Sequence, residues 1–253
     1  MARFFVDYEN INEETGKAFI DGTDVNHVKN VLRKEIGEDL VLCNPSGAAF
    51  CCTIEGFAEG RVLCIIKHPI SDTAEPRVPV TLYQGVPKSD KMELIVQKCV
   101  ELGVTKIRPV ITSRTIVKFG SEADKQKKTD RWQKIATEAA KQSGREIVPE
   151  IGKIIGFSEA VEEAFREGGT IIIPYENERD TTLKSVLREE RFAGLTGPER
   201  ISCFIGPEGG FSEEEIKLAG EKCAIPVTLG KRILRTETAG LAVMAAIRYE
   251  LGD

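Results

Sequence analysis

Glycine-rich residues near the carboxyl end of the chain have the spacing of a ligand-binding loop. The run Gly206-Pro207-Glu208-Gly209-Gly210 follows an apolar stretch, residues 201–205, that predicts a buried strand. Ser212 and Glu215 then form a capping-box pattern, which predicts the start of a helix. Glycines at such a junction expose the backbone to a ligand, and N–H groups at the helix start can donate to an electron-rich group.

A second segment of the same kind follows in the sequence. Residues 226–229 predict a short strand, and Thr236 is positioned to cap a final helix rich in Ala, Leu, Val and Met. Both loops therefore follow strands at their carboxyl ends, where open α/β sheets bind ligands. On spacing alone, a pair of tight turns explains these glycines equally well.

Several chemistries are disfavoured by what the chain lacks. Only two histidines are present, His27 and His68, and neither has a spacing that suggests a zinc site or a Ser-His-Asp arrangement. The seven cysteines show no C-x-x-C spacing and are interpreted as reduced core residues. No G-x-G-x-x-G follows the first strand of the second half and no P-loop motif occurs, so a dinucleotide site is not expected. Because neither the histidines nor the cysteines have the spacing of a metal site, we expect no bound metal ion.

The distribution of charge limits how the chain could bind nucleic acid. The whole net charge of −5 arises in residues 1–72, which carry seven Lys or Arg and twelve Asp or Glu. Any RNA contact must then come from local patches. The densest patch comprises Lys118, Lys125, Lys127, Lys128, Arg131 and Lys134. With no signal-peptide pattern and no apolar run near the roughly 20 residues of a membrane span, we expect a cytoplasmic protein without a membrane segment.

Two domains are predicted from the change in pattern along the chain. Residues 1–72 contain short strands and one helix, near 24–34, as in a small β-barrel. Residues 71–79 have the composition of a linker. In residues 73–253, strands at 80–85, 107–111, 147–151, 170–174, 201–205 and 227–229 alternate with helices at 90–102, 130–143, 158–167 and 182–190. This alternation predicts an α/β domain with a mostly parallel sheet covered on both faces.

The two carboxyl-terminal loops closely resemble the signature of the SPOUT-class RNA methyltransferases, and within that class the RsmE-type family. The matching runs are Ile205-Gly206-Pro207-Glu208-Gly209-Gly210-Phe211 and Leu229-Gly230-Lys231-Arg232-Ile233-Leu234-Arg235-Thr236-Glu237-Thr238-Ala239. Smaller matches are Lys91-Met92-Glu93 with Lys98, Glu101-Leu102-Gly103, Gln142-Ser143-Gly144-Arg145, and His27-Val28 with Val31-Leu32-Arg33. The chain departs from the family at Ser113, where an acidic residue is usual, and at Asn26, where the family usually has a first histidine before His27.

The resemblance implies a fold and an activity. It implies a PUA-like RNA-binding domain over residues 1–72 and a trefoil-knotted methyltransferase domain over residues 73–253. It also implies a homodimer that uses S-adenosylmethionine (SAM) to methylate N3 of a uridine in 16S ribosomal RNA of the small subunit. The residues expected to bind the cofactor are Pro174, Glu176, Gly206, Pro207, Glu208, Gly209, Leu229, Gly230, Ile233, Leu234, Thr238 and Ala239.

Methylation at N3 requires that the uracil N3 proton leave. Arg235 and Arg145 are candidates to stabilise a uracilate oxygen, and Glu237 or Glu208 could take the proton, although both carboxylates could instead favour a helix start. The residues expected to contact RNA are Arg3, His27, Arg33, Arg114, Gln142 and Arg145. Two other functions stay open on sequence alone, a non-catalytic RNA-binding assembly factor and a small-molecule oxidoreductase.

Overall fold

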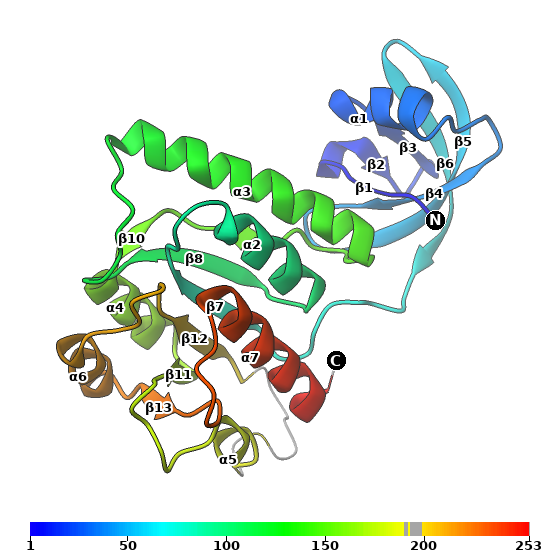
Figure 1. The fold of residues 1–253 in the computed structure, drawn as a ribbon. Coiled ribbons are helices and arrows are strands. Elements are labelled where there is room, and N and C mark those ends of the chain that lie inside the picture. Colours follow the sequence, from blue (N-terminus) through cyan, green and yellow to red (C-terminus); the bar gives the residue numbers. More distant parts are fainter. Residues whose placement is uncertain (190–191, 193–198, 253) are drawn as a thin grey trace. The chain divides into compact units, whose positions relative to one another are not determined.

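The computed structural model describes residues 1–189, 192 and 199–252 (Figure 1). The chain forms two compact units: Met1–Glu75 with Ala140–Val148, and Pro76–Ala139 with Pro149–Asp253. The first unit thus extends past the expected domain end at residue 72 and includes a segment that the sequence placed in the second domain. The domain boundary between residues 72 and 73 stays a prediction.

The first unit is a β-rich domain built on one six-stranded sheet with the order β1-β4-β5-β6-β3-β2. Its sheet is antiparallel except for the parallel pair of β1 and β4. Phe4, Ile20, Leu40, Leu42 and Ile54 form the centre of its core. The strands are β1 (Arg3–Phe5), β2 (Ile11–Asn12), β3 (Lys17–Ile20), β4 (Asp39–Cys43), β5 (Ala49–Ala58) and β6 (Arg61–Ile70), with short helical turns at η1 (Tyr8–Asn10), α1 (Thr23–Asn26) and η2 (His27–Val31). A small β domain with one helical segment was predicted and is confirmed.

The second unit is an α/β domain around a parallel sheet with the order β10-β8-β7-β12-β11-β13, to which β9 is added beside β8. The two central strands, β7 (Val80–Gly85) and β12 (Ile201–Ile205), are buried along their whole length. The remaining strands are β8 (Lys106–Ile111), β9 (Glu150–Ile151), β10 (Ile155–Gly156), β11 (Thr170–Pro174) and β13 (Ile225–Val227). Continuous apolar strands of this kind require helices on both faces, as the predicted fold class states.

Successive side chains of β7 show which helices cover each face. Tyr83 stacks on Phe204 of β12 and belongs to the core under α4 (Phe157–Glu167) and α6 (Glu213–Glu221). Leu82 and Gln84 point the other way, toward Gly240 of α7 (Thr236–Leu251). α2 (Lys91–Glu101) and α5 (Leu183–Leu187) pack against α7 on that face (Figure 1).

One helix is longer than the sequence predicted. We expected a helix over residues 130–143, but α3 (Glu122–Ser143) starts eight residues earlier. The Ser121 hydroxyl accepts a hydrogen bond from the Asp124 backbone N–H at 3.2 Å, which supplies the start signal. The first two turns are almost entirely polar, so they carry no apolar periodicity to reveal them. The helix predicted over 182–190 is α5, and residue 190 lies outside the described residues.

Candidate functional site

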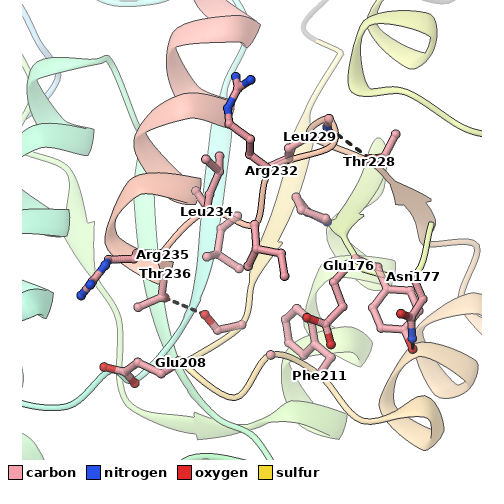
Figure 2. A pocket seen from close by; sticks show the side chains of 18 of the residues that line it. Glu176, Asn177, Glu208, Phe211, Thr228, Leu229, Arg232, Leu234, Arg235 and Thr236 are labelled. Carbon is pink, nitrogen blue, oxygen red and sulfur yellow. Dashed lines mark hydrogen bonds between the residues drawn. The ribbon is translucent and has the colours of Figure 1, made fainter. Parts of the chain in front are cut away.

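A pocket of about 490 Å³ lies at the carboxyl ends of β11, β12 and β13 (Figure 2). β11 pairs with both β12 and β13 in parallel, so the loops that follow these three strands leave the sheet at the same edge. Residues from 174–179, 205–211 and 228–236 form its walls, together with Lys91 and Ala239. The predicted position of the ligand loops at strand ends is therefore what the structure shows.

The first loop needs glycine at two positions for different reasons. A Cβ on Gly206 would lie 3.0 Å from the backbone carbons of Gly210, so a side chain there would force the loop apart. Gly210 has a φ of +67°, a left-handed conformation that favours glycine. The capping box predicted at the start of α6 is confirmed: Ser212 Oγ accepts from Glu215 N at 3.2 Å, and Glu215 Oε2 accepts from Ser212 N at 2.9 Å.

Thr236 ties the second loop to the first. Its hydroxyl donates to the Gly206 carbonyl oxygen at 2.6 Å, shown by a dashed line in Figure 2, and accepts from Gln84 Nε2 at 3.0 Å. The prediction that Thr236 caps the final helix is wrong. Arg235 occupies the N-cap position without a side-chain hydrogen bond, and Thr236 is the first helical residue. Its hydroxyl instead satisfies groups of two other strand ends, which sequence spacing cannot show.

An ion-pair cluster joins three chain segments beside the pocket. Lys91 Nζ, in the first turn of α2, lies 3.1 Å from Glu208 Oε1 and 3.2 Å from Glu237 Oε2. Glu208 Oε1 also accepts from the Lys88 backbone N–H at 3.1 Å. Glu237 Oε2 is buried and lacks the geometry of a hydrogen bond despite its short distance to Lys91. The cluster thus fixes the entry to α2 against both carboxyl-terminal loops.

The cluster also sets the charge states of its members. Burial alone raises the pKa of Glu208, but hydrogen bonds from its own backbone N–H, from Lys91 and from Lys88 outweigh burial and lower that pKa. The hydrogen bond to Glu208 in turn raises the pKa of Lys91. At neutral pH the carboxylate of Glu208 and the ammonium of Lys91 are therefore both charged.

Most residues predicted to bind the cofactor line this pocket, and two do not. Gly209 is outside the lining, and its carbonyl accepts from Arg114 Nη1 at 2.8 Å. Thr238 is exposed and lies in the first turn of α7, where its N–H donates to the Arg235 carbonyl at 2.9 Å. The sequence reasoning missed Lys91, Tyr175, Asn177, Arg179, Ile205, Gly210, Phe211, Thr228, Lys231, Arg232 and Thr236 as lining residues. Residues 175–179 could have been found from their position directly after the strand at 170–174.

The four residues predicted to act in catalysis are not all brought together. Glu208 and Arg235 line the pocket, whereas Glu237 pairs with Lys91 and is not part of the lining. Figure 2 shows the Arg235 guanidinium turned away from Glu176 and Phe211 across the pocket. Arg145 belongs to the first unit, where its Nη2 lies 2.5 Å from Glu75 Oε2 and only 3% of the residue is exposed. That environment favours a structural role for Arg145.

The other residues predicted to contact RNA differ in availability. Arg3 pairs with Glu146 at 2.8 Å, and His27 is half-buried with its ring edge-on to Phe4. Arg33 and Gln142 are exposed in the first unit, and Arg114 is exposed in the second. Within residues 1–189, 192 and 199–252, no group of three or more His, Cys, Asp or Glu could hold a metal ion, and no helix could span a membrane.

Comparison with known proteins identifies relatives that cover nearly the whole chain. The family model for the RNA methyltransferase domain matches residues 74–248, and the family model for the RNA methyltransferase PUA domain matches residues 20–67. Ribosomal RNA small subunit methyltransferase E of Bacillus subtilis (strain 168) is 32% identical over 99% of this chain and 97% of the relative.

Solved structures show the same similarity. The crystal structure of ribosomal RNA small subunit methyltransferase E from Neisseria gonorrhoeae, bound to S-adenosyl methionine, superposes with a TM-score of 0.84 at 36% identity over 98% of this chain and 97% of that one. The methyltransferase Lpg2936 of Legionella pneumophila, in complex with SAM, gives a TM-score of 0.81 at 31% identity with the same coverage.

Proposed function

Because the chain belongs to the family of the ribosomal RNA small subunit methyltransferases E, we propose that it transfers a methyl group from SAM to N3 of one uridine in 16S ribosomal RNA. The observation that carries the proposal is the pocket between the two glycine-containing loops, which lies where the signature motifs meet. The activity and the donor follow the family, and the choice of N3 follows the resemblance of those motifs.

The residues of the pocket fit SAM. Its volume of about 490 Å³ is within the range of roughly 300 to 1,000 Å³ that is usual for sites of small ligands. Leu229 and Leu234 offer apolar walls, Gly206 and Gly210 let a ligand approach the backbone, and Glu176 supplies a carboxylate (Figure 2). SAM, when bound, supplies an electrophilic methyl group, so the protein has mainly to orient the acceptor.

The chain must also manage the proton of the acceptor nitrogen. Glu208 lines the pocket and Glu237 does not, so Glu208 is the better-placed proton acceptor. Its lowered pKa keeps it ionised and able to accept, but also makes it a weak base. A cation beside the uracil oxygens would compensate by stabilising the anion. Arg235 is exposed at the pocket, and its guanidinium has no hydrogen-bonded or ion-paired partner in the described part of the chain, so Arg235 is the candidate for that role.

The partners follow from the same proposal. The substrate is 16S ribosomal RNA, free or within the small subunit, and the working compartment is the cytoplasm. We also propose a homodimer, as the resemblance implies; Tyr249 of α7, which is 89% exposed, is available for such a contact. Measurement of the mass in solution tests the dimer separately from the activity.

Methyl transfer tests the proposed function. Unmodified 16S RNA, free and within small subunits, is incubated with the protein and SAM carrying a labelled methyl group, and the product is mapped by mass spectrometry. We expect one labelled uridine with the methyl group on N3. RNA binding without transfer of label would indicate a non-catalytic assembly factor and would contradict the proposal.

A further inference from the structure

The loop between β13 and α7 carries an unusual group of exposed side chains. We define the cationic rim as Lys231, Arg232, Ile233 and Arg235, all of which are exposed and line the pocket. Ile233 is 85% exposed, although it is a large apolar residue. Among the described residues, none of the three cations of the rim has an ion-paired or hydrogen-bonded partner, whereas Lys91 at the same pocket contacts two carboxylates.

The rim projects beyond the space that a small ligand would occupy. Gly230 begins the loop with a φ of +105°, a conformation that other residues rarely adopt. Figure 2 shows the side chains of Arg232 and Arg235 leaving the pocket in different directions, so their guanidinium groups are outside it. The guanidinium groups of Arg232 and Arg235 thus face outward from the pocket.

A solvated surface loop is the simplest explanation of any single exposed lysine or isoleucine. Here the combination argues for a ligand. The three cations have no carboxylate among the described residues to compensate them, and an exposed β-branched residue among them gains nothing from water. A strand of RNA would provide partners for both the cations and Ile233. Its phosphates would neutralise the cations, and an unstacked base or ribose would cover the apolar side chain.

We propose that the cationic rim binds the RNA strand that flanks the target uridine, with Lys231 and Arg232 on phosphates and Ile233 against an unstacked nucleoside, while Arg235 stays beside the uracil as proposed above. The proposal rests on the proposed function, because it takes the substrate to be RNA. It differs from the expectation that the basic patch of Lys118, Lys125, Lys127, Lys128, Arg131 and Lys134 supplies the phosphate contacts. A strand held at the rim is adjacent to the pocket, so the rim would deliver the uridine to the site of transfer.

Charge reversal at matched positions tests the rim. The double variant Lys231→Glu/Arg232→Glu changes the net charge by as much as the control Lys127→Glu/Lys128→Glu, whose exposed lysines lie on α3 in the same unit. RNA affinity is measured for each protein with unmodified 16S RNA over a range of salt concentrations, and SAM affinity by calorimetry. We expect the rim variant to bind RNA about tenfold more weakly or worse. Its salt slope should fall by about 1.4, or 0.7 for each lost single-strand phosphate contact.

The control variant should stay within about twofold of the wild type in RNA affinity and within about threefold in SAM affinity. Ile233→Ser should weaken RNA binding without changing the salt slope, because it removes an apolar contact and no charge. If the rim reversal also abolishes SAM binding, the uncharged pair Lys231→Gln/Arg232→Gln is measured instead. In that case a salt slope lowered relative to the wild type supports the rim.

Unchanged RNA affinity and slope in the rim variants would overturn the inference, and so would a loss confined to the α3 control. Failure of the proposed function gives a different result. If the wild type binds RNA through the rim but transfers no methyl group, the activity is wrong and the rim stands. If the wild type methylates uridine while rim reversal has no effect, only the rim is wrong.

Discussion

Replacement of Thr236 by valine should weaken both the fold and the binding of SAM. The hydroxyl of Thr236 is the group through which the start of α7 holds the Gly206 loop, and the residue is 6% exposed. Valine has nearly the same shape but cannot donate to the Gly206 carbonyl or accept from Gln84. The substitution therefore removes the hydrogen bonds without leaving a large cavity.

The size of the effect follows from the groups left without partners. The half-buried Gly206 carbonyl loses a 2.6 Å hydrogen bond, and a fully buried acceptor left without a partner costs about 1–3 kcal/mol. Gln84 Nε2 loses less, because it still donates to the Gly85 carbonyl at 3.0 Å. We expect Thr236→Val to lower the free energy of unfolding by about 2–3 kcal/mol. SAM affinity should fall about tenfold, as about 1.4 kcal/mol of that loss appears at the pocket.

Urea denaturation followed by tryptophan fluorescence measures the first effect. Trp132 is the only tryptophan of the chain and is buried in α3 within the unit that contains the pocket. Calorimetric titration with SAM measures the second effect. Thr236→Ser is the control, because serine keeps the hydroxyl and loses only a methyl group, worth about 1 kcal/mol.

The proposed role of the Thr236 hydroxyl in connecting the two loops would be refuted if the valine variant were as stable as the serine variant and bound SAM with the wild-type affinity. A loss of stability with no change in SAM affinity would show that the hydrogen bond supports the fold but does not shape the pocket.

Two further predictions concern single side chains. Six of the seven cysteines are buried and Cys223 is exposed, and burial raises the pKa of Cys99 to about 12. A thiol reagent at pH 8 should therefore label one thiol rapidly in the native protein and seven after unfolding. More than one rapidly labelled thiol in the native protein would contradict the observed burial. Burial raises the pKa of Glu163, but its contacts with Arg108 and Lys106 outweigh burial and lower that pKa below its usual 4.5. The ionised Glu163 carboxylate with these two cations therefore stabilises the fold above pH 4.5, and the stabilisation disappears as the pH falls through the lowered pKa. The difference in unfolding free energy between wild type and Glu163→Gln should therefore shrink below pH 4.5, and a difference that grows there would reverse the assignment.

The sequence predicted the parts of the site that local rules determine. The apolar run at 201–205 and the Ser212/Glu215 pair are local signals, and both appear as expected in β12 and α6. The position of the loops at one sheet edge followed from the general behaviour of parallel strands. These features depend on neighbours in the chain, so a single sequence contains them.

Contacts between distant segments were not predictable in the same way. Lys91 meets Glu208 and Glu237 across more than a hundred residues, and no periodicity links those positions. Thr236 has the residue type of a helix cap, but its hydroxyl is used by Gly206 because the folded chain brings that carbonyl within 2.6 Å. Competition between a local and a distant partner is decided by packing, which sequence spacing does not report.

The central claim is that SAM binds between the loops of residues 205–211 and 228–236. A crystal structure of this protein with SAM tests it most directly. We expect the donor within the pocket, in contact with the backbone of Gly206 and Gly230 and with the side chains of Leu229 and Leu234. A donor bound at any other place in the chain would contradict it.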